Sequence, residues 1–167
     1  MGTMTRVAIL TASDSGARGD RADASGDVIA TRCIEAGHTL VRRAILGDDR
    51  ASLAAALAGW CDEGIADVII TTGGTGLTAR DVTPEATREI GEREVPGIPI
   101  ALALGGLRKT PFAALSRGAA VTRGVTLVVN LPGSPGAVAE GMDVLLPLLD
   151  HVAELLRGPV NHDGRQM

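Results

Sequence analysis

The hydrophobic positions along the chain come in short runs that alternate with amphipathic stretches, the pattern of an α/β protein. Strands are predicted over residues 6–11, 38–46 and 66–72, the first of them buried and parallel, with two more flanking the Arg123-Gly124 dipeptide within residues 119–133. Helices are predicted over residues 27–37, 48–64 and 83–93, in part of 95–111, and over 134–158. The alternation predicts a three-layer α/β/α fold, with a mostly parallel sheet and one antiparallel hairpin.

Cap residues and prolines predict where several of these helices begin and end. We expect the first helix to be capped near Ser25 and to be ended by Gly37. Thr83 is expected to cap the third helix, with Pro84 in its first turn. Pro147 is expected to break the last helical stretch into two helices, because proline removes a helical hydrogen bond.

Two segments fall outside this alternation. The polar, glycine-containing stretch of residues 12–26 is too long for a plain connection and is therefore a candidate functional loop. The tail, residues 159–167, is expected to be frayed and flexible.

The composition narrows the class of protein and its partners. At 167 residues the length favours one domain covering 1–167, with a core from about 6 to 158. The net charge of −4 leaves no basic surplus to bind phosphates. With one Trp, one Phe and no Tyr, the chain also lacks the aromatic side chains on which bases would stack. Both observations argue against a nucleic-acid partner. The sequence shows no membrane-spanning run and no signal segment, and Cys33 and Cys61 lack metal-ligand spacing. We therefore expect a cytoplasmic protein with reduced, packed thiols.

The stretch Thr71–Ala86, "TTGGTGLTARDVTPEA", is rich in glycine and directly follows a predicted strand. It is not a Walker loop, because the chain's only lysine is Lys109. Residues 74–79 match a dinucleotide fingerprint, but no acid follows at the expected distance to hold a ribose. A third interpretation is a nest of backbone N–H groups that binds an anion, with Asp81 recruiting Mg²⁺ beside it. The plain structural interpretation, in which the glycines make a tight turn and Asp81 caps the next helix, is equally compatible with the spacing.

Further acids follow the other predicted strands. Asp14 comes after the first strand, and Asp48 and Asp49 follow the second, just as Asp81 lies beyond the third. In a parallel sheet these loops open at the same carboxyl edge, where ligands of such folds bind. Taken singly each acid suits a cap or a solvated loop, but their coincidence with the glycine loop favours a shared site.

A second dense loop, "NLPGSPGAV", spans Asn130–Val138 and leads into the last helix. Ser134 as cap and Pro135 in the first turn would give it an ordinary structural role. A second anion- or ring-binding loop is the functional alternative. Arg117, in "LSR", is the best-placed cation, because arginine can hold a phosphate through two hydrogen bonds.

The order "TTGGTG…RDVTPEA", "VPG", "LSR" and "NLPGSPGAV", after "SDS…DASG" near the N-terminus, resembles the MogA/MoaB family of molybdenum cofactor biosynthesis. The resemblance extends from about residue 6 to 158. It implies a MogA/MoaB-like fold and a molybdopterin adenylyltransferase, which attaches AMP from Mg-ATP to the terminal phosphate of molybdopterin and releases pyrophosphate. It also implies a homotrimer or a hexamer, and hand-over of the product to a separate metal-inserting protein.

The resemblance further implies the residues of the site. Asp48 and Asp81 match the family's two functional acids, both concerned with Mg²⁺ and phosphate placement. The positions that would bind molybdopterin or ATP are Ser13, Asp14, Gly73, Gly74, Thr75, Gly76, Thr83, Pro84, Glu85, Ser116, Arg117, Asn130, Pro132, Gly133, Ser134 and Gly136. Gly136 stands where some members carry a lysine, whose role would pass to Arg80, Arg117 or the backbone.

Two other functions compete with this one. A molybdopterin-binding or carrier protein with little catalysis would share the pterin-binding loops but would not require both Asp48 and Asp81. An oxidoreductase would instead bind a dinucleotide at the glycine loop, and NAD(H) binding would reveal it.

Overall fold

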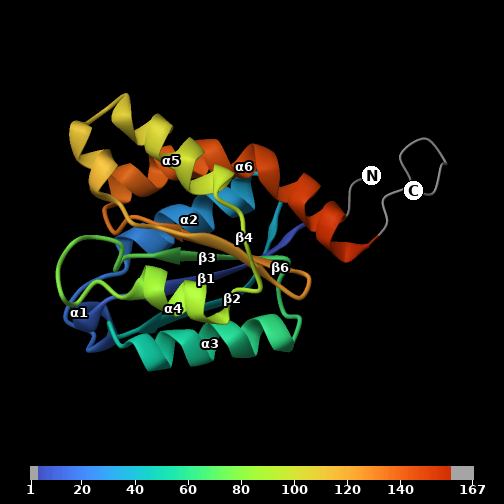
Figure 1. Ribbon diagram of the computed structural model, residues 1–167, viewed down its shortest axis with the longest axis horizontal. Helices are drawn as coiled ribbons and strands as arrows, with labels where there is room; N and C mark the ends of the chain where they lie inside the picture. Colours follow the sequence, from blue (N-terminus) through green and yellow to red (C-terminus); the bar gives the residue numbers. More distant parts are fainter. Residues whose placement is uncertain (1–3, 159–167) are drawn as a thin grey trace.

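The computed structural model describes residues 4–158, which form one six-stranded sheet covered by helices on both faces (Figure 1). The strands are β1 (Arg6–Ala12), β2 (Thr39–Leu46), β3 (Val68–Thr72), β4 (Arg93–Glu94), β5 (Ala120–Arg123) and β6 (Thr126–Leu131). The helices are α1 (Asp14–Ala17), α2 (Ala24–Glu35), α3 (Arg50–Asp62), α4 (Thr83–Ile90), α5 (Gly97–Leu107), the 3₁₀ helix η1 (Pro111–Leu115) and α6 (Pro135–Arg157). The tail for which fraying was predicted lies outside the described residues.

The sheet order is β2-β1-β3-β6-β5-β4. β2, β1, β3 and β6 run parallel, whereas β5 pairs antiparallel with β6 and β4 pairs antiparallel with β5. The predicted three-layer fold and its hairpin are confirmed; Gly124 takes a positive φ of 57° in the turn. β2 lies on one side of β1, and the next strand along the chain, β3, lies on the other. The strand order therefore reverses here, and the carboxyl ends of β1 and β3 mark a point where such sheets bind ligands.

Aliphatic side chains fill both layers between helices and sheet. One cluster packs α2 and α6 against one face, and the other packs α3 and α4 against the opposite face. Cys33 and Cys61 are buried, free thiols within these two clusters, as predicted. Among residues 4–158, no helix has the length and apolar character needed to cross a membrane.

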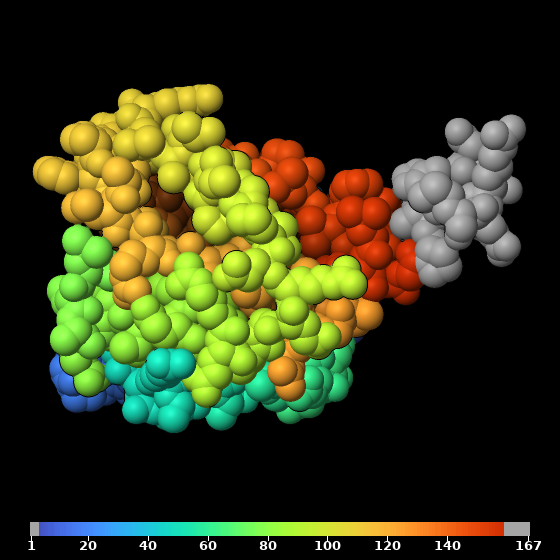
Figure 2. All heavy atoms as spheres, viewed as in Figure 1, coloured from blue at the N-terminus to red at the C-terminus, as the bar shows by residue number. Residues whose placement is uncertain are grey.

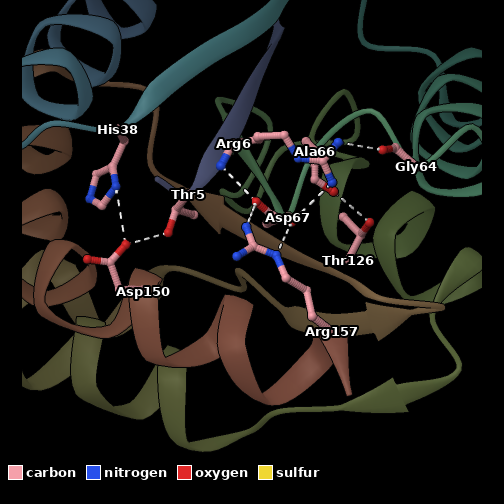
Figure 3. A network of polar contacts seen from close by, with 9 residues as sticks. All are labelled: Thr5, Arg6, His38, Gly64, Ala66, Asp67, Thr126, Asp150 and Arg157. Carbon is pink, nitrogen blue, oxygen red and sulfur yellow. Dashed lines mark hydrogen bonds and ion pairs between the residues drawn. The ribbon is translucent and has the colours of Figure 1, made fainter. Parts of the chain in front are cut away.

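A polar network ties the last helix to the amino ends of the strands (Figure 3). The carboxylate of Asp67, only 1% exposed, accepts hydrogen bonds from the backbone N–H of Arg6 (2.8 Å) and from the guanidinium groups of Arg6 and Arg157. Nearby, Asp150 accepts a hydrogen bond from Thr5 and lies 3.6 Å from His38 Nδ1. The network lies at the opposite end of the strands from the candidate functional loops.

The predictions of a cap at Thr83 and of a break at Pro147 were wrong, and the cap expected near Ser25 lies two residues earlier. Asp23 caps α2 by accepting from the N–H of Gly26, while the hydroxyl of Ser25 donates to the carbonyl of Gly133 (2.6 Å). Val82 occupies the cap position of α4, and the hydroxyl of Thr83 is buried.

Pro147 does not divide the last helix. α6 is continuous from Pro135 to Arg157, because the fully buried Leu145 and Leu149 hold it against the sheet on both sides of the exposed proline. Tertiary packing thus outweighs the hydrogen bond that Pro147 cannot make.

The short strand β4 was not predicted. α4 ends at Ile90, and the extended Gly91 passes so close to β5 that a Cβ there would lie 2.7 Å from Val121 Cβ. The chain can therefore turn along the sheet edge, where the N–H of Glu92 donates to the carbonyl of Thr122.

Candidate functional site

The loops that follow β3 and β6 meet at the carboxyl edge of the sheet. The hydroxyl of Thr72 donates to the carbonyl of Pro132 (2.6 Å), and the N–H of Gly73 donates to the carbonyl of Leu131 (3.2 Å). Gly73 and Gly74 take positive φ angles of 90° and 68°, and a Cβ on Gly73 would lie 2.4 Å from the carbonyl oxygen of Ala12. Glycine is therefore required where three strand ends approach one another.

Together these two loops form a wall between two cavities. Gly73 and Gly74 line a polar cavity of about 200 Å³, whereas Thr75 and Gly76 line an apolar cavity of about 330 Å³. The other loop alternates in the same way: Gly133 and Pro135 line the polar cavity, and Pro132 and Ser134 the apolar one. The predicted site residues are thus brought to one edge but shared between two cavities.

Two of the predicted acids line the polar cavity, and a third, Asp14, is hydrogen-bonded to one of them. Asp48 and Asp81 line it together with Ser13. Asp14 is linked to Asp48 by a reciprocal pair of hydrogen bonds, in which each backbone N–H donates to the other's carboxylate (2.9 and 3.1 Å). Arg80 closes this group by donating to both carboxylate oxygens of Asp14.

The pKa values of Asp14 and Asp48 are shifted in opposite directions. The N–H of Asp48, and then Arg80, lower the pKa of Asp14. Burial raises the pKa of Asp48, and the charges of Asp14 and Asp81 raise it further, although the N–H of Asp14 opposes the increase. A cation placed beside Asp48 would therefore offset the burial and repulsion that raise its pKa.

Asp81 and Arg117 both shape the glycine loop. One carboxylate oxygen of Asp81 accepts from the N–H and hydroxyl of Thr78. Arg117 donates to the carbonyls of Gly76 and Asp81 (2.8 Å each) and pairs with Glu85, which lowers the pKa of Glu85. The guanidinium predicted to hold a phosphate is thus engaged with protein groups.

Other predicted residues have equally defined positions. The buried side chain of Asn130 accepts from the N–H of Ala119 and donates to the hydroxyls of Thr71 and Thr87 (2.9 Å each). Ser13 and Ser134 cap α1 and α6.

Three more predicted positions lie beside the two cavities. Ser116 lines the apolar cavity. Pro84 is buried in the first turn of α4. Gly136 is exposed, with open space where a side chain would project.

The backbone of the glycine loop has free donors. In the part of the chain that the structure describes, the N–H groups of Gly74, Thr75 and Gly76 have no hydrogen-bond acceptor, unlike that of Gly73. Exposed N–H groups in a glycine loop before a helix suit an anion. Within residues 4–158 no group of three or more His, Cys, Asp or Glu side chains is arranged to hold a metal by itself.

Three charged residues that line the cavities were not predicted from the sequence. Arg21, an exposed loop residue, lines the polar cavity and makes no ion pair with any described residue. Asp23 lines the same cavity, where Thr11 and Arg43 donate to its buried carboxylate. Glu140, in α6, lines the apolar cavity. The only signal for Asp23 was its place in the "DASG" stretch; Arg21 and Glu140 had none.

Comparisons with known proteins agree on one family. Residues 8–151 match the model described as a probable molybdopterin binding domain. The chain is similar to the molybdopterin biosynthesis enzyme MoaB of Thermus thermophilus, with 46% identity, a TM-score of 0.86, and coverage of 92% of this chain and 96% of that one. It is 33% identical to a molybdopterin adenylyltransferase of Helicobacter pylori over 91% of this chain and 88% of that protein.

A longer relative is matched only in part. The chain is 38% identical to the molybdenum cofactor synthesis protein cinnamon of Drosophila melanogaster over 92% of this chain, but it spans only 26% of that protein.

Proposed function

The chain belongs to the MogA/MoaB family of molybdenum cofactor biosynthesis, and on that premise we propose that it is a molybdopterin adenylyltransferase. In the proposed reaction an oxygen of the terminal phosphate of molybdopterin forms a bond to the α-phosphorus of ATP. The bond between that phosphorus and the oxygen bridging to the β-phosphorus breaks, and pyrophosphate leaves. No side-chain nucleophile is needed, so the protein acts by positioning the substrates and offsetting their charge.

The observation that carries this proposal is the wall between the two cavities. A transfer between two large substrates requires two adjoining sites whose reactive ends meet. Residues 73–76 and 132–135 border a polar cavity on one side and an apolar cavity on the other. The polar side suits phosphates, and the apolar side suits a flat ring.

The acids fit a shared magnesium ion. Mg²⁺ takes one or two protein carboxylates and completes its coordination with water and phosphate oxygens, so it does not need three protein ligands. Asp48 and Asp81 both line the polar cavity, and burial and mutual repulsion raise the pKa of Asp48. These two residues would hold the ion, which would offset phosphate charge.

The triphosphate would be bound mainly by the backbone. The free N–H of Gly74, which lines the polar cavity, offers a donor, and the free N–H groups of Thr75 and Gly76 follow it at the boundary with the apolar cavity. Arg80 and Arg117 are engaged by Asp14 and Glu85. We therefore assign to Arg21, which lines the same cavity, the neutralising role that a lysine at position 136 would otherwise have.

The test is to mix the protein with molybdopterin and Mg-ATP and to measure pyrophosphate. The proposal predicts release that requires both substrates. Tight pterin binding without release would instead support a carrier protein. The engagement of Arg80 and Arg117 with protein partners favours that second candidate, because neither guanidinium is free for phosphate.

The proposal includes a homotrimer, or a hexamer of two trimers. α5 is apolar around its whole circumference, yet only Ile98 is buried, and Ile100 and Leu104 are 60% and 59% exposed. Helices of this kind are normally covered, which supports a subunit interface on α5. Light scattering after size exclusion tests the assembly.

Hand-over to a metal-inserting protein and a cytoplasmic location complete the proposal. The long relative cinnamon, of which this chain matches a part, supports contact with a further protein of the pathway. The two free, buried cysteines support a reducing compartment.

A further inference from the structure

Arg80 and Asp14 join two loops beside the polar cavity. Figure 2 shows the two segments in contact, with the green atoms of the loop that precedes α4 against the blue atoms of α1. The guanidinium of Arg80 donates three hydrogen bonds to the two carboxylate oxygens of Asp14, of 2.8, 2.9 and 3.1 Å. Asp14 follows Ser13 and Arg80 precedes Asp81, and both of these neighbours line the cavity. The ion pair therefore lies at the edge of the cavity that suits phosphates.

This ion pair can be exchanged at little cost. The side chains of Arg80 and Asp14 are 67% and 35% exposed, and exposed ion pairs contribute little to stability. Among residues 4–158, Asp14 is the only partner of the Arg80 side chain. Arg117, by contrast, also donates to the backbone carbonyls of Gly76 and Asp81. Arg80 can thus leave its partner without breaking a bond to the backbone of the glycine loop.

A phosphate group offers Arg80 the same kind of acceptor as Asp14. The guanidinium fork binds either a carboxylate or a phosphate through two parallel N–H bonds. Asp14 is already fixed beside Arg80, because its carboxylate also accepts from the N–H of Asp48 (2.9 Å). A phosphate in the polar cavity therefore competes with Asp14, and its apparent affinity falls by the fraction of time for which Arg80 is free.

The neighbouring acids add to this competition. The hydrogen bonds and the charge of Asp14 raise the pKa of Arg80, and the charges of Asp48 and Asp49 raise it further, although desolvation opposes the increase. Arg80 is thus attracted by three acids. A ligand with several phosphate charges is best able to draw it away from them.

We propose that Asp14 is an internal competitor for Arg80: it holds the guanidinium away from phosphate, and a polyphosphate bound in the polar cavity takes its place. The competition weakens the binding of polyphosphates, so that one released in the cavity leaves more readily. The identity of these polyphosphates as ATP and pyrophosphate rests on the proposed function. The exchange itself requires neither molybdopterin nor Mg²⁺ and is tested without them.

The test measures binding of inorganic tripolyphosphate by calorimetry, in buffer freed of divalent cations by a chelating resin. Asp14→Asn keeps the oxygen that accepts from the N–H of Asp48 but removes the charge that holds Arg80. We expect this variant to bind tripolyphosphate roughly 10-fold more tightly, the value of one charge-assisted hydrogen bond. Arg80→Gln should weaken binding, and adding it to Asp14→Asn should abolish the gain.

Asp49→Asn is the matched control. It removes an acid whose charge also acts on Arg80 but which is hydrogen-bonded to Ser52 instead. We expect it to change tripolyphosphate binding less than about 3-fold, as for an exposed charge without a direct contact.

Three results would overturn the proposal. The first is a folded Asp14→Asn variant that binds tripolyphosphate no more tightly than wild type. The second is a gain that persists when Arg80→Gln is added, and the third is an equal gain in Asp49→Asn, because either would show only a general loss of repulsion.

Unfolding in urea identifies any variant that has lost its structure. If Asp14→Asn does not fold, Arg80→Gln decides, since wild-type binding by that variant would also overturn the proposal. Pyrophosphate release with molybdopterin and Mg-ATP tests the proposed function separately. A protein that shows the exchange but releases no pyrophosphate would contradict only that function.

Discussion

Gly74 offers a direct test of how the wall between the cavities is built. A Cβ at this position would lie 2.3 Å from Thr83 Oγ1 and 3.3 Å from Asp48 Oδ1, and the residue has a φ of +68°. Gly74→Ala therefore adds left-handed strain of about 1–2 kcal/mol and overlap with a buried side chain of about 1–3 kcal/mol. We expect the free energy of unfolding to fall by roughly 2–5 kcal/mol, measured by urea denaturation followed by circular dichroism.

Two further variants separate these contributions. Gly37 has a similar φ of +86° with nothing within 4 Å of an added Cβ, so Gly37→Ala should show the strain alone, about 1–2 kcal/mol. Adding Thr83→Ala to Gly74→Ala removes the nearest overlapping atom and should recover about 1–2 kcal/mol relative to additivity. Equal losses in Gly74→Ala and Gly37→Ala, with no recovery, would refute the packing of Gly74 on Thr83.

Two further predictions concern the core. Asp67→Asn leaves Arg6 and Arg157 without a carboxylate partner. Because both arginines are partly exposed, we expect the free energy of unfolding, measured in urea at pH 7, to fall by about 2–4 kcal/mol. The control, Asp62→Asn, breaks a surface pair with Arg123 and should cost less than about 1 kcal/mol. Burial raises the pKa of Asp67, but the hydrogen bonds from Arg157 and Arg6 outweigh it and bring the pKa below its ordinary 3.8. The stabilisation by Asp67 is therefore present above pH 3.8 and disappears as the pH falls through the folded value. A difference between wild type and Asp67→Asn that persists in acid would contradict this. Burial raises the pKa of Cys33 and of Cys61 to about 11. A thiol reagent at about pH 8 should therefore react with the native protein far more slowly than with protein unfolded in urea. Rapid labelling of the native protein would contradict the burial of these thiols.

The architecture was predictable because strand and helix periodicity reflects burial on each face. β1, β3 and β6 are largely apolar and almost wholly buried between the two helical layers. The acids that follow β1, β2 and β3 had to lie at one edge, because these strands are parallel. The predicted break at Pro147 was wrong because the buried Leu145 and Leu149 pack α6 against the sheet on both sides of the proline and keep the helix continuous. The strands that they contact are distant in the sequence. The cap expected near Ser25 falls at Asp23, because the hydroxyl of Ser25 donates instead to a distant acceptor, the carbonyl of Gly133.

The division of the site into two cavities could not be read from the sequence. It depends on which way successive residues of two converging loops face, and no local pattern encodes that direction. Arg117 and Asn130 look like ligand-binding residues in their motifs, yet their side chains satisfy neighbouring protein groups. Arg21 and Glu140 matter only through the cavities they line, and the cavities exist only in the folded chain.

Pyrophosphate release by Asp48→Asn and Asp81→Asn tests the central claim most directly. Both acids line the polar cavity, whereas the adjacent Asp49 is exposed and caps α3, a role that asparagine also fills, so Asp49→Asn is the matched control. We predict that wild type and Asp49→Asn release pyrophosphate with molybdopterin and Mg-ATP. The two cavity variants should fold and bind 6-hydroxymethylpterin, but release pyrophosphate on the order of 100-fold more slowly. Wild-type rates in both cavity variants would contradict the claim that these acids serve adenylyl transfer.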